Sequence, residues 1–343
     1  MSLPASSQPS RGLAPSASTS RFRVTGAAAL RSGGPILFAI VAIAIPMLVS
    51  GYALREATAI LMFMTLALSW NLVGGLCGYP SFGNVAFFGI GAYVTAGLVA
   101  NLHWPFFPAA GVAALSALGF AAVIGPVVLR LHGHYFAIAT LGTAQALGQI
   151  VIMVPWVGGP NGIILRVPYA TSGQYFYYLM AGALGGALLI TYAILRGSWG
   201  YACRMIRQDE IAAAASGVNT TFYKTACWSL SAFVAALVGG VYALWITFVN
   251  PPSVFDPLIS LTMVVLALVG GAGTLWGPVL GAFLVENIDQ YLWARLLTAH
   301  TLFLGLVIVV IVLFLPRGIW PYLTGQQGLA WRSLFEGTKR LRV

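Results

Sequence analysis

The sequence predicts an all-α, polytopic membrane protein, and three observations carry this prediction. Of 343 residues, 59% are hydrophobic and only 7% are charged, whereas soluble domains carry about 25% charged residues. The mean hydropathy is +0.89. Apolar runs recur from Pro35 to Pro316, and a helix needs ~20 such residues to cross a bilayer. The runs are continuous, without the period-two alternation of a membrane β-barrel, so that class is disfavoured.

The two ends of the chain are basic and rich in polar residues. Residues 1–34 carry Arg11, Arg21, Arg23 and Arg31 among Ser, Pro and Ala, a composition typical of disorder. We expect a cytoplasmic tail there, with an organellar transit peptide as the competing interpretation. Residues 321–343 are expected to form a second basic cytoplasmic tail. The membrane domain is predicted over residues 35–320.

Seven apolar segments are predicted to cross the membrane in turn, starting from the cytoplasm. They are residues 35–53, 57–73, 82–100, 107–129, 134–155, 174–195 and 222–248. This order places Arg130 and the stretch 196–224 inside, as the positive-inside rule requires. Arg55 and Arg166 fall outside and are exceptions.

The last membrane stretch, residues 256–320, contains the Gly- and Pro-bearing run GGAGTLWGP at 270–278. Two crossings there would leave the basic C-terminal tail outside, against the positive-inside rule. Three crossings return it to the cytoplasm and give about ten in total. The piece 258–269 is short for a full span, so we expect a helix broken near Gly270 to Gly273.

A polar, mixed-charge segment at about 204–220 interrupts the apolar pattern, within RMIRQDEIAAAASGVNTTFYK. Asp209 and Glu210 suit a helix N-terminus, and Gly217 suits the position after a helix C-terminus. Glu210, Ala213, Ala214 and Gly217 then share one narrow face. Two interpretations stay open: a solvated interfacial helix, or a surface on which a partner protein docks.

Polar and glycine residues inside the apolar segments are candidates for a substrate pathway. Asn84, Thr140 and Gln145 suit either a pathway or hydrogen bonds between helices. Small residues such as Gly91 equally favour close helix packing. Glu286 and Asp289 lie near a predicted helix end, where solvation relieves the cost of a charge.

The sequence lacks the residues that several classes of protein function require. The two lysines complete no P-loop, so an ATPase site is not expected, and the histidines show no metal-ligand spacing. Cys77, Cys203 and Cys227 are interpreted as small packing residues, because an odd number outside an oxidising compartment does not suggest disulfides. An ion-coupled carrier or channel remains the alternative of a different class, although buried acids are scarce. A membrane enzyme would need a clustered nucleophile and base, which the sequence lacks.

Six motifs occur in an order that resembles one protein family. The segment 204–224 resembles the cytoplasmic coupling segment of ATP-binding-cassette import permeases of the branched-chain amino acid type, the LivM-like branch. The other motifs are FGNVAFFGIGAY (82–93), GHYFAIATLGTAQ (133–145), GGPNGI (158–163), VVLALVGGAGTLWGPVLGA (264–282) and LFLPRGI (313–319). Together they cover about residues 35–320.

The resemblance implies a ten-helix permease subunit of the inner membrane. Its implied partners are a second, homologous LivH-like permease, two cytoplasmic ABC ATPase subunits, a periplasmic substrate-binding protein and membrane lipid, with no nucleic acid. It implies no cofactor or metal on this chain, because ATP and Mg would be used by the ATPase subunits. Branched-chain or other apolar amino acids are the first substrate choice, and urea, short amides or aromatic acids are the alternative.

The resemblance also assigns residues to roles. The ATPase-coupling residues it implies are Arg207, Gln208, Asp209, Glu210, Ala213, Ala214 and Gly217. The pathway residues predicted from motifs and polarity are Asn84, Phe87, Gly91, Tyr135, Thr140, Gln145, Gly270 and Gly271. The chain departs from many relatives at GYPSFGN (78–84), where Tyr79, Pro80 and Asn84 replace the residues of Gly-Gln-x-Ser-Leu-Gly-His.

Overall fold

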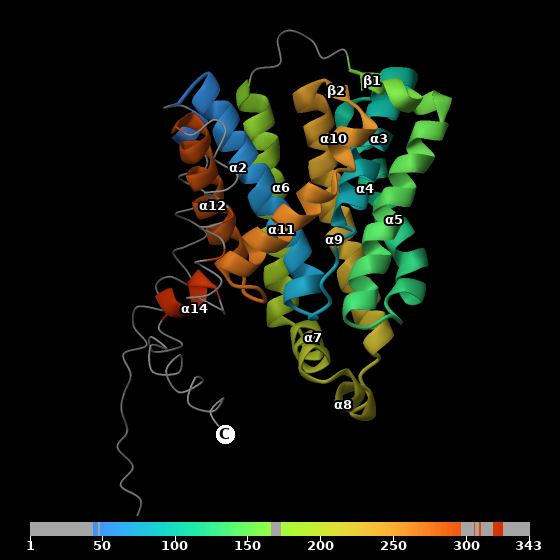
Figure 1. Cartoon of the computed structure of the whole chain (residues 1–343), viewed down its shortest axis with the longest axis vertical. Helices are drawn as coiled ribbons and strands as arrows, with labels where there is room; N and C mark the ends of the chain where they lie inside the picture. The colour runs from blue at the N-terminus through green and yellow to red at the C-terminus, as the bar shows by residue number, and fades with distance from the viewer. Residues whose placement is uncertain are drawn as a thin grey trace, which may run out of the picture. The chain divides into compact units, whose positions relative to one another are not determined.

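A computed structural model describes residues 44–46, 49–165, 173–295, 305, 309 and 318–324. Helices make up most of these residues, which confirms the all-α membrane fold (Figure 1), and most of the helical residues lie in long helices. They are α2 (Tyr52–Trp70), α3 (Asn84–Leu102), α4 (Phe106–Val128), α5 (His134–Met153), α6 (Gly173–Arg196), α9 (Thr220–Ile246), α11 (Pro257–Gly270) and α12 (Gly277–Arg295).

Shorter elements join the long helices. They are the π-helical turn η1 (Asn71–Gly75), the 3₁₀ turns η2 (Pro155–Val157) and η3 (Gly159–Asn161), and the helices α7 (Ser198–Gln208), α8 (Glu210–Ala215), α10 (Pro251–Val254) and α14 (Ile319–Leu323). Strands β1 (Ile163–Ile164) and β2 (Phe248–Val249) pair antiparallel, with Ile163 opposite Val249. Figure 1 places this strand pair at the end of the bundle opposite α7 and α8.

Seven helical stretches of the described residues are long and apolar enough to cross a membrane, the last being α10 and α11 together, Pro251–Gly270. Six of them match the predicted segments from 57–73 to 222–248 within a few residues. The predicted span 35–53 and the apolar run 301–315, which would form the last of the ten crossings, lie mostly outside the described residues, so the count of about ten stays a prediction. The helix break expected near Gly270 is present: α11 ends at Gly270, and α12 begins at Gly277.

Helix α9 forms the centre of the bundle and packs against α3 and α4. Glycines permit the closest approach: a Cβ on Gly239 would overlap the carbonyl of Phe88, and one on Gly91 would overlap the carbonyl of Ala236. The buried Trp228 ring packs edge-on against Phe87 and Phe136, with ring centroids 5.4 Å and 6.2 Å apart. The aromatic packing fixes α3, α5 and α9 as a unit.

Two non-helical segments interrupt the bundle at one end, and side chains pair their backbone groups, as an apolar environment demands. Between η1 and α3, the Trp70 indole donates to the carbonyl of Ser81 at 2.7 Å, and the amide of Phe82 donates to Thr140 Oγ1 at 3.1 Å. In the break after α11, Asn71 Oδ1 accepts from the amide of Gly273 at 2.7 Å, and its Nδ2 donates to the carbonyl of Thr274 at 2.9 Å.

Candidate functional site

The charged segment singled out in the sequence folds into two short helices, α7 and α8, at one end of the bundle (Figure 1). Asp209 caps α8, because its carboxylate accepts from the amides of Ile211 at 2.8 Å and Ala212 at 3.0 Å. Gly217 has φ +85°, and the amide of Val218 donates to the carbonyl of Ala213 at 3.1 Å. Both predicted ends of the helix are therefore confirmed.

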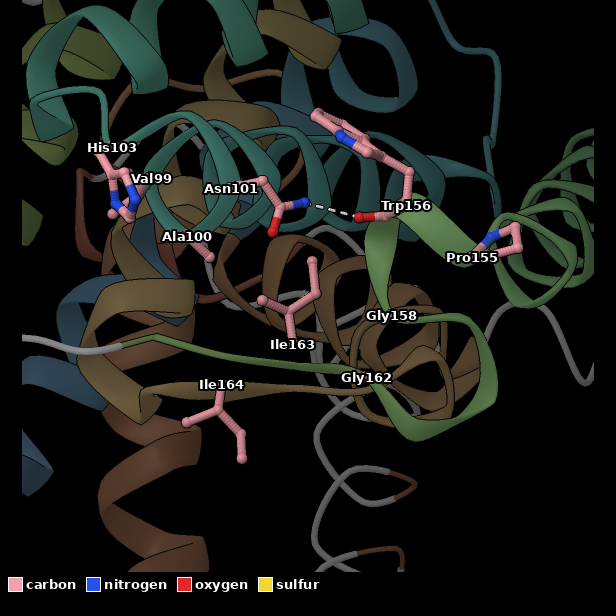
Figure 2. A pocket seen from close by; sticks show the side chains of 10 residues that line it. All are labelled: Val99, Ala100, Asn101, His103, Pro155, Trp156, Gly158, Gly162, Ile163 and Ile164. Atoms are coloured by element: carbon pink, nitrogen blue, oxygen red, sulfur yellow. Dashed lines mark hydrogen bonds between the residues drawn. The ribbon is translucent and has the colours of Figure 1, made fainter.

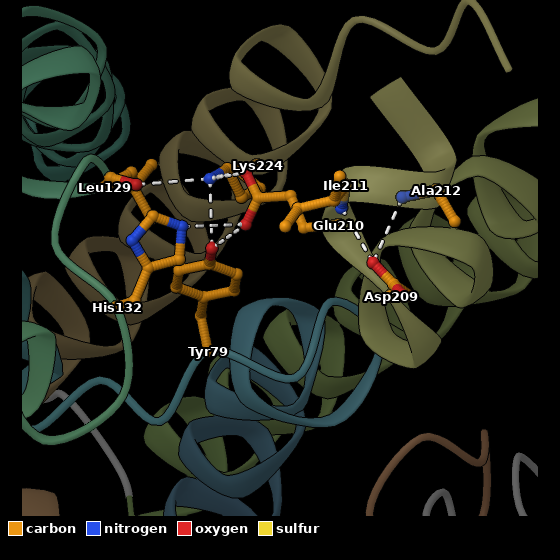
Figure 3. A network of polar contacts seen from close by, with 8 residues as sticks. All are labelled: Tyr79, Leu129, His132, Asp209, Glu210, Ile211, Ala212 and Lys224. Carbon is orange, nitrogen blue, oxygen red and sulfur yellow. Dashed lines mark hydrogen bonds and ion pairs between the residues drawn. The ribbon is translucent and has the colours of Figure 1, made fainter. Parts of the chain in front are cut away.

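Glu210, at the start of α8, points toward the bundle and joins a polar network (Figure 3). Its carboxylate pairs with Lys224 of α9 at 2.5 Å and accepts from the Tyr79 hydroxyl. Lys224 Nζ also donates to Tyr79 and to the carbonyl of Leu129, both at 3.1 Å. His132 Nε2 lies 3.3 Å from the carboxylate. The network thus fastens α8 to α9, to the loop before α3 and to the end of α4.

The environment favours the charged form of Glu210. Burial by itself would raise the pKa of its carboxyl, but the Lys224 ammonium and the Tyr79 hydroxyl outweigh burial and lower it. Burial and the Glu210 carboxylate raise the pKa of Tyr79 well above its ordinary value, so Tyr79 acts as a neutral donor. Lys224 is 3% exposed, and a buried ammonium needs such a partner.

Arg207, at the end of α7, reaches the two interrupted helices. Its Nη1 donates to the carbonyl of Gly75 at 2.6 Å and lies 3.5 Å from the carbonyl of Ala272. The first carbonyl belongs to η1, and the second belongs to the break between α11 and α12. Asn71 joins the same two segments from inside the bundle. One guanidinium therefore connects the α7–α8 segment to the point where both helices are broken.

The face predicted for α8 divides between two environments. Ala213 is 1% exposed and, like Glu210, faces its own chain. Ala214 and Gly217 are exposed, and so is Gln208 at the end of α7. Ile211 is 83% exposed, which sequence reasoning missed because it did not separate the inward from the outward face of α8. The exposed surface of α8 therefore includes Ile211, Ala214 and Gly217.

The predicted pathway residues lie in several places. Asn84 is buried and donates to Ser231 Oγ of α9 at 2.9 Å, close in sequence to the buried Phe87 and Gly91. Thr140 contacts the loop before α3, and Gln145 donates to the carbonyl of Phe255 at 3.3 Å. Tyr135, at the start of α5, is 75% exposed. Gly270 and Gly271 form the end of α11. A common pathway through them stays a prediction.

A cavity of about 520 Å³ lies at the opposite end of the bundle from α8, and Figure 2 shows its lining. The end of α3, the turn η2, the glycines that flank η3 (Gly158 and Gly162), and strand β1 form its walls. Asn101 donates to the carbonyl of Trp156 at 2.7 Å across one side. None of the eight predicted pathway residues lines it.

Comparison with known proteins identifies the family. The model of the branched-chain amino acid transport system permease component matches residues 52–315. The chain belongs to this permease family. The matched range includes both interrupted helices and the whole α7–α8 segment, so the geometry described above lies within the family's own domain. The permease is therefore a multi-pass transport subunit of the inner membrane.

Two curated relatives carry the same description. The high-affinity branched-chain amino acid transport system permease proteins LivM of Salmonella typhimurium (strain LT2) and of Escherichia coli (strain K12) are each 29% identical over 316 residues, which is 82% of this chain and 73% of the relative. These matches confirm the LivM-like resemblance. No solved structure matches the permease.

Proposed function

We propose that this chain is the membrane-spanning subunit of an ATP-driven importer, and that it translocates branched-chain or other apolar amino acids delivered by a periplasmic binding protein. The family match and the printed names of both relatives support the substrate class. ATP and Mg would be used by two cytoplasmic ATPase subunits, and a second, homologous permease would complete the membrane part. Both termini are proposed to lie in the cytoplasm, on the side of Arg130 and the α7–α8 segment.

The observation that carries the proposal is the division of α8 into an anchored face and a free face. Glu210 and Ala213 fix the helix to its own chain. Ile211 leaves an apolar side chain in solvent beside the small Ala214 and Gly217. A partner subunit of the cytoplasm would gain by covering Ile211, because central apolar anchors dominate binding energies at interfaces.

The anchored face gives a mechanical route for the ATPase subunits. Their motion on ATP binding would displace α8, and the Glu210–Lys224 pair would pass the displacement to α9. Arg207 would pass it to η1 and to the α11–α12 break. Interrupted helices respond to such a displacement as hinges, because few residues absorb the change of backbone angles. The permease would then open alternately to the two sides of the membrane.

Lipid and the second permease would cover the sides of the bundle. Within an apolar stretch of 18 residues, only 22% of the residues of α5 and 28% of those of α6 are buried inside this chain. Exposed apolar side chains on these helices include Ile138, Ile150 and Leu189. Such surfaces suit acyl chains or a second apolar subunit.

The test uses the complete importer in proteoliposomes, with uptake and ATP hydrolysis measured together. Ile211→Asp should abolish binding-protein-stimulated uptake, because a charge in the covered contact must be desolvated. Ile211→Val should retain uptake. Both variants should insert into the membrane and unfold thermally like the wild type, because Ile211 is 83% exposed and contributes little to packing within its own chain. Full uptake by Ile211→Asp would refute the docking surface.

A further inference from the structure

All three cysteines of the chain meet at one point inside the bundle. Cys77 follows η1, Cys203 lies on α7, and Cys227 lies on α9. Each side chain is at most 1% exposed. Their sulfur atoms all lie within 4.8 Å of one another, and the Sγ atoms of Cys203 and Cys227 are 3.4 Å apart. Three soft donors from three separate elements are thereby directed at one small volume.

The composition of this cluster restricts which ion it could hold. Soft thiolate ligands select Cu(I), Zn(II) and iron–sulfur clusters. A structural zinc takes four protein ligands, whereas no His, Asp or Glu among the described residues joins the three cysteines. Burial also keeps water from serving as a fourth ligand. A three-coordinate soft ion is the choice that remains, and Cu(I) satisfies it.

The spacing of the sulfur atoms fits such an ion. A metal–sulfur bond of about 2.3 Å places three ligand sulfurs roughly 4 Å apart. The sulfur atoms here are separated by 3.4 Å for one pair and by no more than 4.8 Å for the others. Side-chain rotations that move each sulfur by less than about 1 Å would therefore complete the site.

Two basic residues lie near the cluster along the chain. Arg207 lies one helical turn after Cys203, and Lys224 lies almost one turn before Cys227. Lys224 pairs with Glu210, but Arg207 pairs with no carboxylate among the described residues. Neighbouring cations and thiol donors are the setting in which cysteines bind metals.

We propose that Cys77, Cys203 and Cys227 form a three-thiolate binding site for Cu(I). Binding forms three Cu–S bonds, releases the three thiol protons to solvent and leaves a complex of net charge −2. No electron is transferred, because the ion arrives as Cu(I) from a reducing compartment. The bound ion would join the loop after η1, α7 and α9. The site is independent of the proposed transport function.

The test uses the full-length permease, purified reduced and metal-free under anaerobic conditions. Titration with Cu(I) against a Cu(I)-specific chelator should give one tightly held ion per chain, with thiolate-to-copper absorption in the ultraviolet. X-ray absorption should show three sulfur neighbours. Each of Cys77→Ala, Cys203→Ala and Cys227→Ala should weaken binding by about tenfold or more. Met205→Leu removes a sulfur of α7 outside the cluster and should bind like the wild type.

Three outcomes would overturn the proposal. The first is wild-type Cu(I) affinity in the three cysteine variants. The second is a copper environment of nitrogen and oxygen atoms. The third is a Cys203–Cys227 disulfide in protein whose thiols are alkylated at cell lysis. X-ray absorption of the wild type decides the question even if one variant fails to fold.

Discussion

Arg207 of α7 donates a 2.6 Å hydrogen bond to the carbonyl of Gly75, where η1 ends. The last carbonyls of a helix carry partial negative charge, so a guanidinium is well placed there. The same group faces the carbonyl of Ala272 in the other interrupted segment. The α7–α8 segment thus contacts the bundle where regular hydrogen bonding is already broken, and movement there costs fewer backbone bonds than movement of an intact helix.

Replacing Asn71 should destabilise the permease through the α11–α12 break. Asn71→Ala leaves the amide of Gly273 and the carbonyl of Thr274 without their present partners, at a cost on the order of 1–3 kcal/mol. The thermal unfolding midpoint in detergent should fall. Asn101→Ala is the matched control: Asn101 is exposed, so water can replace its hydrogen bond to the carbonyl of Trp156, and its loss should change the midpoint little. Equal midpoints for Asn71→Ala and the wild type would contradict this role.

Removing the carboxylate of Glu210 should release α8 from the bundle. Glu210→Gln leaves the buried ammonium of Lys224 with only neutral partners, which costs about 1–3 kcal/mol. Limited proteolysis should cut between residues 208 and 219 faster than in the wild type. Arg204→Gln removes a charge from the same segment without touching the network and should leave the cleavage rate unchanged. Similar cleavage of all three proteins would show that the network does not hold α8.

Two glycines on different helices should respond oppositely to the same substitution. Gly239→Ala forces a methyl group into the carbonyl of Phe88 at the α3–α9 crossing, and overpacking typically costs 1–3 kcal/mol. Gly186→Ala on α6 meets open space and should leave stability equal or slightly higher, since alanine favours helices. Unfolding midpoints of the two variants measure the difference. A Gly239→Ala protein as stable as Gly186→Ala would refute the close crossing.

The Glu210 network should lose its stabilising effect only in acid. The pKa of Glu210 is lowered in the folded protein, from an ordinary value of about 4.3. Its contribution is therefore complete above that value and disappears as the pH falls through the lowered pKa. The groups that face it are Lys224, Tyr79 and His132, so the measurement uses a His132→Gln background.

In that background, the difference in unfolding midpoint between Glu210 and Glu210→Gln proteins should stay constant from pH 8 to about 5. Below pH ~4 the difference should shrink. A difference that already shrinks near pH 6 would mean that the carboxyl titrates above its ordinary range and that Lys224 does not stabilise its charge.

The sequence predicts most of the helices but little of their contacts. Apolar length, Arg and Lys bias and the Gly–Pro run at 270–278 locate the spans and the break, because these signals are local. The ends of α8 were equally readable from Asp209 and Gly217. Three features depend on residues far apart in the chain: the Arg207–Gly75 bond, the pairing of Glu210 with Lys224 and Tyr79, and the cysteine cluster. Spacing carries no signal for such pairs.

Tyr79 shows how a departure from the family pattern becomes interpretable. At the level of sequence it is only a replacement within GYPSFGN. In the structure its hydroxyl lies between Lys224 and Glu210, and the Lys224 ammonium lies 4.5 Å from the centre of its ring. The replacement therefore belongs to the module that anchors α8.

The central claim is that Arg207 transmits the motion of the ATPase subunits to the interrupted helices. The most direct test is to measure, for the Arg207→Gln importer in proteoliposomes, the ratio of amino acid taken up to ATP hydrolysed. The amide retains a donor but loses the charge and reach that join α7 to Gly75 and Ala272. Hydrolysis should continue while uptake falls, so the ratio should drop about tenfold or more, as expected for the loss of ~1.4 kcal/mol of coupling. A ratio equal to that of the wild type would contradict transmission through Arg207.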